Sequence, residues 1–330
     1  SDMKDPNTNV VYIVESGITL PDRDYYLLED EQFVKGRELY REYVARLFDL
    51  AGIEGGADKA DALYNLEHAL AEAHWTKEEN RNPVATYNPK TLDELEALAP
   101  NYPWRVAMEA AEIPERDFYI VRQPSFYEGA NQVLADTPIE TWKDYLAFQT
   151  IDNFAAILGD EFFQARFDFY QAGLSGISEP EERWKRAVNA VNGTLGELLG
   201  QLYVDKHYQE EAKVRMDVMI ANLVEAYRQS INDLEWMSEE TKQQALVKLS
   251  KFNPKVGYPE EWRDYSAMNI VAGDLAGNVK RAATFEYNRN IDKLDKPVDK
   301  NEWFMNPQTV NAYYNPVWNE IVFPAAILQP

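Results

Sequence analysis

Apolar side chains recur at helical spacing along most of the first 250 residues of this chain. In residues 35–50 they fall at Leu39, Tyr43, Leu47 and Leu50. A stripe of this kind predicts an amphipathic helix that buries one face against a core. The same spacing predicts further helices over residues 58–74, 141–158, 161–172, 183–203 and 210–234.

Two helix starts are marked by capping residues. Thr91 lies three residues before Glu94, which is a capping-box pattern. Ser238 precedes Glu239 and Glu240, and acidic residues are favoured in the first turn, near the positive end of a helix. We therefore predict that helices begin directly after Thr91 and Ser238.

Strand patterns are few, and most lie near the end of the sequence. One short β-branched run covers residues 9–14, and a stronger pair, Val310–Tyr314 and Glu320–Leu328, flanks a turn at Asn315-Pro316. The helical pattern gives way to proline and glycine within Phe252–Tyr258. We predict a mainly α fold, with a helical region over residues 1–250 and a mixed α and β region over residues 251–330.

Charge and composition exclude several function classes. The 330 residues carry a formal net charge of −23 and no cysteine. Such a surface repels phosphate backbones and anionic lipid, so we expect no nucleic-acid partner. The absence of cysteine excludes disulfides and thiolate nucleophiles. No apolar run approaches the roughly 18 residues of a membrane span, and the first residues do not resemble a signal peptide.

The three histidines do not form a metal-binding pattern. His68 and Glu72 are four residues apart and share a helix face, whereas His74 falls on a different face and His207 is distant. The chain has no His-Glu-x-x-His segment. We interpret the histidines as solvated residues on helix faces and predict no metal ligand in this chain.

Other catalytic patterns are weak. The chain has no Gly-x-Ser-x-Gly elbow and no phosphate-binding loop. Acidic pairs such as Glu181-Glu182 occur among many aromatic residues, so a glycosidase with two carboxylates stays open as an alternative. With 56 acidic residues, however, pairs of this kind arise by chance.

Asn311 stands out in the penultimate strand-like run, because asparagine is disfavoured in strands. Its amide can both donate and accept hydrogen bonds. A strand edge that carries such an amide is suited to bind an extended peptide by β-augmentation. An ordinary hairpin is the equal alternative on this pattern alone.

Several segments together resemble the neprilysin family of zinc metallopeptidases, which includes endothelin-converting enzyme and the bacterial oligopeptidase PepO. The most specific are Val310-Asn311-Ala312-Tyr313-Tyr314 and the run from Asn319 to Pro330 that contains Phe-Pro-Ala-Ala-Ile-Leu-Gln-Pro. Residues 17–26, 82–92 and 298–303 match further family motifs. The resemblance covers essentially the whole chain and is strongest to bacterial members.

The resemblance implies a large helical cover domain followed by the first α/β strands of a thermolysin-like zinc peptidase domain. It implies a zinc-dependent endopeptidase that hydrolyses peptide bonds in oligopeptides, with zinc polarising the scissile carbonyl. In this family the zinc helix follows the Leu-Gln-Pro segment, so we expect this chain to be an internal piece. The zinc site, all metal ligands and all catalytic residues are then expected in a complementary C-terminal part, and this chain alone is expected to be inactive.

Carried over by position, the resemblance assigns substrate-binding roles. Asn311 and Ala312 are expected to hydrogen-bond the substrate backbone, Tyr313 and Tyr314 to continue that edge strand, and Ile327 to line an apolar pocket. Two positions depart from the family pattern. Thr19 and Ala326 stand where glycine is usual, and Ala326 adjoins that pocket.

Two further expectations complete the prediction. If the chain exists alone, the alternative function is a non-catalytic peptide-binding or regulatory module. Bacterial members of the family are often exported, so we expect a periplasmic or extracellular protein, which a lipid anchor upstream of Ser1 could hold at the membrane. A cytoplasmic location is the alternative.

Overall fold

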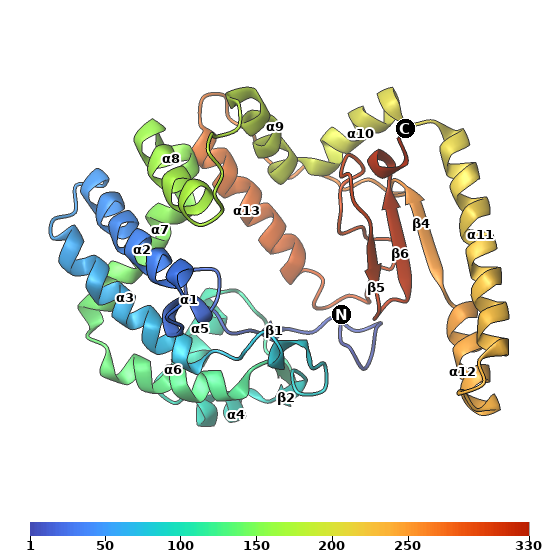
Figure 1. Ribbon diagram of the computed structural model, residues 1–330, viewed down its shortest axis with the longest axis horizontal. Helices are drawn as coiled ribbons and strands as arrows, with labels where there is room; N and C mark the ends of the chain where they lie inside the picture. Colours follow the sequence, from blue (N-terminus) through green and yellow to red (C-terminus); the bar gives the residue numbers. More distant parts are fainter. Residues whose placement is uncertain (330) are drawn as a thin grey trace. The chain divides into compact units, whose positions relative to one another are not determined.

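The predicted helices dominate the computed structural model, which describes residues 1–329 (Figure 1). The chain forms two compact units, each built from more than one segment. The helical unit comprises Val10–Glu181 and Val271–Gly277, and the mixed unit comprises Ser1–Asn9, Glu182–Ile270 and the residues from Asn278 on. The mainly α fold is confirmed. The functional division near residue 250 stays a prediction.

The helical unit contains most of the predicted amphipathic helices. Its elements are β1 (Tyr12–Ile13), α1 (Asp24–Leu27), α2 (Glu31–Leu50), α3 (Gly56–Ala73), a 3-10 turn (Glu79–Arg81), β2 (Asn88–Lys90), α4 (Leu92–Leu98), α5 (Trp104–Ala110), β3 (Tyr119–Val121), α6 (Pro124–Asp136), α7 (Ile139–Leu158), α8 (Asp160–Arg166) and a π-helical segment (Phe167–Gly173).

The predicted apolar stripes form the core of this unit. Leu47 of α2, Leu63 of α3 and Phe148 of α7 are each fully buried in one cluster. A second cluster packs Leu95 and Trp104 against the small sheet, in which β3 lies between parallel β1 and antiparallel β2. The capping box is confirmed, because the Thr91 side chain accepts from the Glu94 amide and the Glu94 side chain accepts from the Thr91 amide.

The mixed unit combines four helices, most of a fifth and a three-stranded sheet. Its elements are α9 (Arg183–Thr194), α10 (Gly196–His207), α11 (Glu210–Asp233), α12 (Glu239–Ser250), β4 (Asn253–Gly257), α13 (Leu275–Ile291), β5 (Tyr313–Asn315), β6 (Glu320–Pro324) and a 3-10 helix (Ala325–Leu328). Ser238 caps α12 as predicted, because its side chain accepts from the Thr241 amide.

Three predicted boundaries were wrong. The helix expected over residues 183–203 is interrupted at Leu195, where α9 ends and α10 begins. The second strand of the terminal pair stops at Pro324, because residues 325–328 turn into a 3-10 helix. The first strand begins only at Tyr313, so Asn311 and Ala312 precede it.

None of the helices in residues 1–329 is both long enough and apolar enough to cross a membrane.

Candidate functional site: an edge strand for peptide alignment

Strand β5 forms one edge of the sheet in the mixed unit. The strand order is β4-β6-β5, with β6 parallel to β4 and antiparallel to β5 (Figure 1). Tyr313 pairs with Val322 and Asn315 pairs with Glu320. Because β5 has a neighbouring strand on one side only among residues 1–329, its other side presents backbone groups that another strand can pair with. This is the geometry that β-augmentation requires.

Asn311 lies just before this edge strand and is exposed. The side-chain Oδ1 of Asn311 accepts a hydrogen bond from the backbone amide of Ala312 at 2.8 Å. The backbone amide of Asn311 donates to Thr309 O at 3.0 Å. The side chain is therefore held close to the backbone. Its Nδ2 group has no hydrogen-bond partner within residues 1–329, so it remains available as a donor.

The two tyrosines of β5 have different environments. The hydroxyl of Tyr313 accepts a hydrogen bond from the Phe304 amide at 3.1 Å, and burial raises the pKa of Tyr313 to about 12. Tyr314 is 46 % exposed, and its hydroxyl donates to Asn319 Oδ1 at 3.2 Å. Tyr313 thus anchors the strand to the preceding loop, whereas Tyr314 is open to a partner.

Ile327 lies in the 3-10 helix that follows β6 and is 38 % exposed. In the β5–β6 register, the residues before Tyr313 run alongside those after Val322. Asn311, Ala312 and Ile327 therefore lie at the same end of this strand pair. Ala326 is buried and donates its amide to Pro307 O at 2.9 Å, so its side chain points into the fold rather than into solvent.

A buried ion pair joins the middle strand, β6, to the outer strand β4. The carboxylate of Glu320 on β6 is fully buried, and Lys255 Nζ on β4 lies 2.8 Å from its Oε2. Within the described residues, neither oxygen receives an aligned hydrogen bond, so the attraction is electrostatic. Sequence reasoning missed this pair. The available signal was an acidic residue that opens an otherwise apolar strand.

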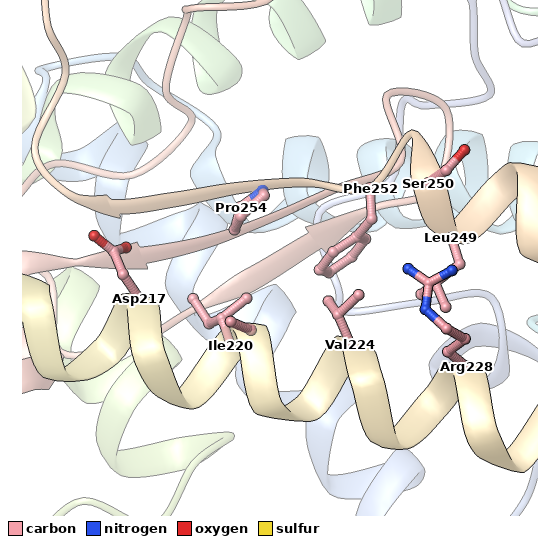
Figure 2. A pocket seen from close by; sticks show the side chains of 9 residues that line it. Asp217, Ile220, Val224, Arg228, Leu249, Ser250, Phe252 and Pro254 are labelled. Carbon is pink, nitrogen blue, oxygen red and sulfur yellow. The ribbon is translucent and has the colours of Figure 1, made fainter.

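A hollow of about 540 Å³ separates α11 from β4. Figure 2 shows Ile220 and Val224 of α11 directed toward Phe252 and Pro254. The salt-bridging residue Arg228 lies toward one end of this wall. The hollow adjoins β4, on the opposite edge of the sheet from β5, and we assign it no role in peptide alignment.

The histidines do not build a metal site with these residues. His68 Nδ1 lies 3.9 Å from Glu72 Oε1 on a half-exposed helix face, and His207 is exposed. The solvated interpretation was wrong for His74, which is buried, with Nε2 3.1 Å from Ser16 O and Nδ1 3.7 Å from Glu15. Burial lowers the pKa of His74.

A catalytic zinc ion takes three protein ligands. Residues 1–329 contain no group of three or more histidine, cysteine or acidic side chains placed to hold a metal ion. The described residues therefore do not fit zinc, and we assign no catalytic step to a metal held by them.

Comparisons with known proteins identify the family of this chain. A family model described as "Peptidase family M13" matches residues 1–259. The chain is 30 % identical to human endothelin-converting enzyme 1 over 347 residues, covering 100 % of this chain and 44 % of the relative. It is 31 % identical to a neutral endopeptidase of Lactobacillus helveticus over 338 residues, covering 100 % of this chain and 51 % of that protein.

A solved structure of a related protease is similar to this chain over the chain's whole length. An inhibitor complex of a zinc metalloprotease from Mycobacterium tuberculosis matches with a TM-score of 0.92 and 41 % sequence identity, covering 100 % of this chain and 50 % of that one. The chain thus spans about half the length of the relatives that it matches. Since the family model matches well over half of the chain, this protein belongs to peptidase family M13.

Proposed function

We propose that this chain is part of a zinc-dependent endopeptidase that cleaves oligopeptides, and that it supplies the strand that aligns the substrate. The observation that carries the proposal is the open edge of β5, preceded by the exposed amide of Asn311, in a chain of peptidase family M13. The zinc ligands are then expected in a part of the protein outside this sequence.

The alignment step follows from strand geometry. An extended peptide beside β5 replaces the missing neighbour strand and forms backbone hydrogen bonds with the edge. Asn311 Nδ2 donates to a substrate carbonyl, and Ala312 O accepts from a substrate amide. Ile327, at the same end of the strand pair, packs against a substrate side chain. These contacts hold the scissile bond in one orientation, which accelerates reaction by positioning rather than by bond chemistry.

We further propose that residues 1–250 form a cover domain and that residues 251–330 are the first part of the catalytic domain.

We propose export from a bacterial cell as the setting for such an oligopeptidase. Cell fractionation of the source organism tests this, with the periplasmic or extracellular fraction expected to contain the protein.

The central test uses the full-length protein, purified with zinc, and an internally quenched oligopeptide. We expect zinc-dependent cleavage, and we expect Asn311→Ala to lower kcat/KM by about 10- to 100-fold, the effect of losing one or two substrate hydrogen bonds. The exposed loop variant Asn301→Ala is the matched control and is expected to keep full activity.

Thermal unfolding of both variants should match the unmodified protein, because Asn301 and Asn311 are exposed. An Asn311→Ala enzyme with unchanged kcat/KM would refute the role of the edge strand. A full-length protein that binds the peptide but never cleaves it would instead support the alternative of a non-catalytic peptide-binding module.

A further inference from the structure

A second hollow, of about 560 Å³, lies entirely within the helical unit. It opens among β1, α3, α5, α6 and α7, and aromatic side chains form a large part of its wall. Its volume falls in the range of sites for small molecules, which is roughly 300–1,000 Å³. Six aromatic side chains line it: Tyr102, Trp104, Phe126, Tyr127, Trp142 and Tyr145.

The walls of this aromatic pocket are well supported. The rings of Trp142 and Tyr145 pack edge to face with centroids 5.8 Å apart, and Phe126 and Tyr127 do so at 5.1 Å. Helices α3 and α6 approach so closely that a Cβ at Gly129 would lie 2.6 Å from Ala73 Cβ. These contacts hold in place the elements that surround the pocket.

Three polar groups in the lining have no partner among the described residues. The indole Nε1 of Trp142 is buried and unpaired. The hydroxyls of Tyr127 and Tyr145 form no hydrogen bond in the described part of the chain, although both side chains line the pocket. A tyrosine hydroxyl that lines a pocket without a partner can donate to an acceptor on a bound molecule.

The charge around the pocket disfavours anions. None of the lining side chains is charged. Burial raises the pKa values of Tyr127 and Tyr145, with smaller contributions from the nearby acidic residues Glu15 and Glu67 respectively, so both hydroxyls keep their protons and remain donors. A negatively charged molecule would therefore lose its hydration without gaining a cation among the lining side chains.

We propose that this aromatic pocket binds a small, flat, uncharged molecule that carries at least one hydrogen-bond acceptor. The aromatic rings supply stacking surfaces, which aromatic ligands exploit in offset or edge-to-face packing. The phenol donors of Tyr127 and Tyr145 orient the acceptor. The site is separate from the β5 edge and does not depend on peptide cleavage.

The test compares 2-naphthol with 2-naphthalenesulfonate on the full-length protein at neutral pH, by isothermal titration calorimetry. These probes have the same ring system and differ in charge. We expect one site for 2-naphthol and at least about tenfold weaker binding of the sulfonate, a difference of roughly 1.4 kcal/mol. Equal affinities for the two probes would overturn the proposed preference for uncharged molecules.

Two substitutions locate the site. Ala130→Phe fills the aromatic pocket and is expected to weaken 2-naphthol binding at least tenfold, whereas Ala221→Phe fills the hollow beside α11 and is expected to leave binding unchanged. If Ala130→Phe fails to fold, the double variant Tyr127→Phe/Tyr145→Phe keeps the volume and removes two donors, and it should weaken binding several-fold.

Two results would refute the site itself. The first is 2-naphthol binding that Ala130→Phe, shown to be folded by thermal unfolding, leaves unchanged. The second is a full-length protein that does not bind 2-naphthol at all.

Discussion

The phenol of Tyr26 donates a hydrogen bond to Oε2 of Glu67 at 2.5 Å, and both side chains are buried in the core of the helical unit. The same oxygen accepts from the Thr19 amide at 2.7 Å, and Oε1 accepts from the Tyr40 hydroxyl at 2.9 Å. These donors come from the segment before α1, from α1 itself and from α2, whereas Glu67 lies on α3. One buried carboxylate therefore joins four parts of the chain.

Removing one of these donors should destabilise the protein. We expect Tyr26→Phe to lower the free energy of unfolding by about 1–3 kcal/mol, because the carboxylate stays buried with one partner fewer. Urea unfolding followed by circular dichroism measures the change. Tyr314→Phe is the matched control, since that exposed hydroxyl should contribute about 0.5 kcal/mol or less. Equal stability of the two variants would contradict the proposed role of the donor.

The stability of the protein should also depend on the protonation of Glu67. Burial raises the pKa of Glu67 from 4.5 to about 7, and the hydrogen bonds only partly oppose this shift. Because the folded state binds the proton more tightly than the unfolded state, this group contributes most stability below about pH 4.5. That contribution is lost as the pH rises through about 7.

We therefore expect the free energy of unfolding to fall by about 3 kcal/mol from this group between about pH 4.5 and 8. Urea unfolding across this range measures it, and Glu67→Gln should lack that decline. The control Glu72→Gln changes a mostly exposed residue of the same helix and should keep the decline. Parallel pH profiles for Glu67→Gln and the unmodified protein would exclude Glu67 as the titrating group.

The helices were predictable because their signals are local. The stripe in residues 35–50 and the cap at Thr91 involve residues within a few positions of one another. The break at Leu195 was missed. Gly193 and Gly196 flank it and are local signals that weaken a helix, and a tertiary contact lies at the same place. Gly196 is covered by the side chain of Asn306, which leaves no space for a Cβ. Helical periodicity contains no information about a residue 110 positions away.

The candidate site was predictable in part. The resemblance predicted an edge strand with neighbouring substrate-binding residues. Among residues 1–329, β5 lies at the edge of its sheet, and the substrate-binding roles stay a prediction. The burial of His74 and the pair between Lys255 and Glu320 were missed. Burial of a histidine or a glutamate costs free energy unless a polar or charged partner offsets the loss of hydration. Here those partners are distant in sequence, and single-sequence patterns do not reveal them.

The capping box at α4 offers a simple test of a confirmed local prediction. We expect Thr91→Ala to lower the free energy of unfolding by about 0.5–2 kcal/mol, because the Glu94 amide loses its acceptor. Thr91→Ser keeps the hydroxyl and should retain most of the stability. Thermal unfolding of the two variants provides the comparison. A loss that is the same in Thr91→Ser and Thr91→Ala would exclude the hydroxyl as its cause.

Arg263 pairs with two carboxylates of the mixed unit. Its guanidinium lies 3.0 Å from Glu197 Oε1 on α10 and 2.6 Å from Glu286 Oε1 on α13. The Arg263 amide also donates to Glu197 Oε2 at 2.8 Å. Because Glu197 is buried, we expect Arg263→Met to lower the free energy of unfolding by about 3 kcal/mol, since a buried charge loses its counter-ion.

The double variant Arg263→Met/Glu197→Met separates charge from packing. If the cost of Arg263→Met comes from the uncompensated carboxylate, removing that carboxylate should restore much of the stability. Urea unfolding should then give the double variant a larger free energy of unfolding than the single variant. Arg228→Met breaks an exposed pair with Glu225 and should cost at most about 1 kcal/mol. A double variant less stable than Arg263→Met would show instead that the packing of these side chains, rather than their charge balance, joins α10 to the loop at Arg263.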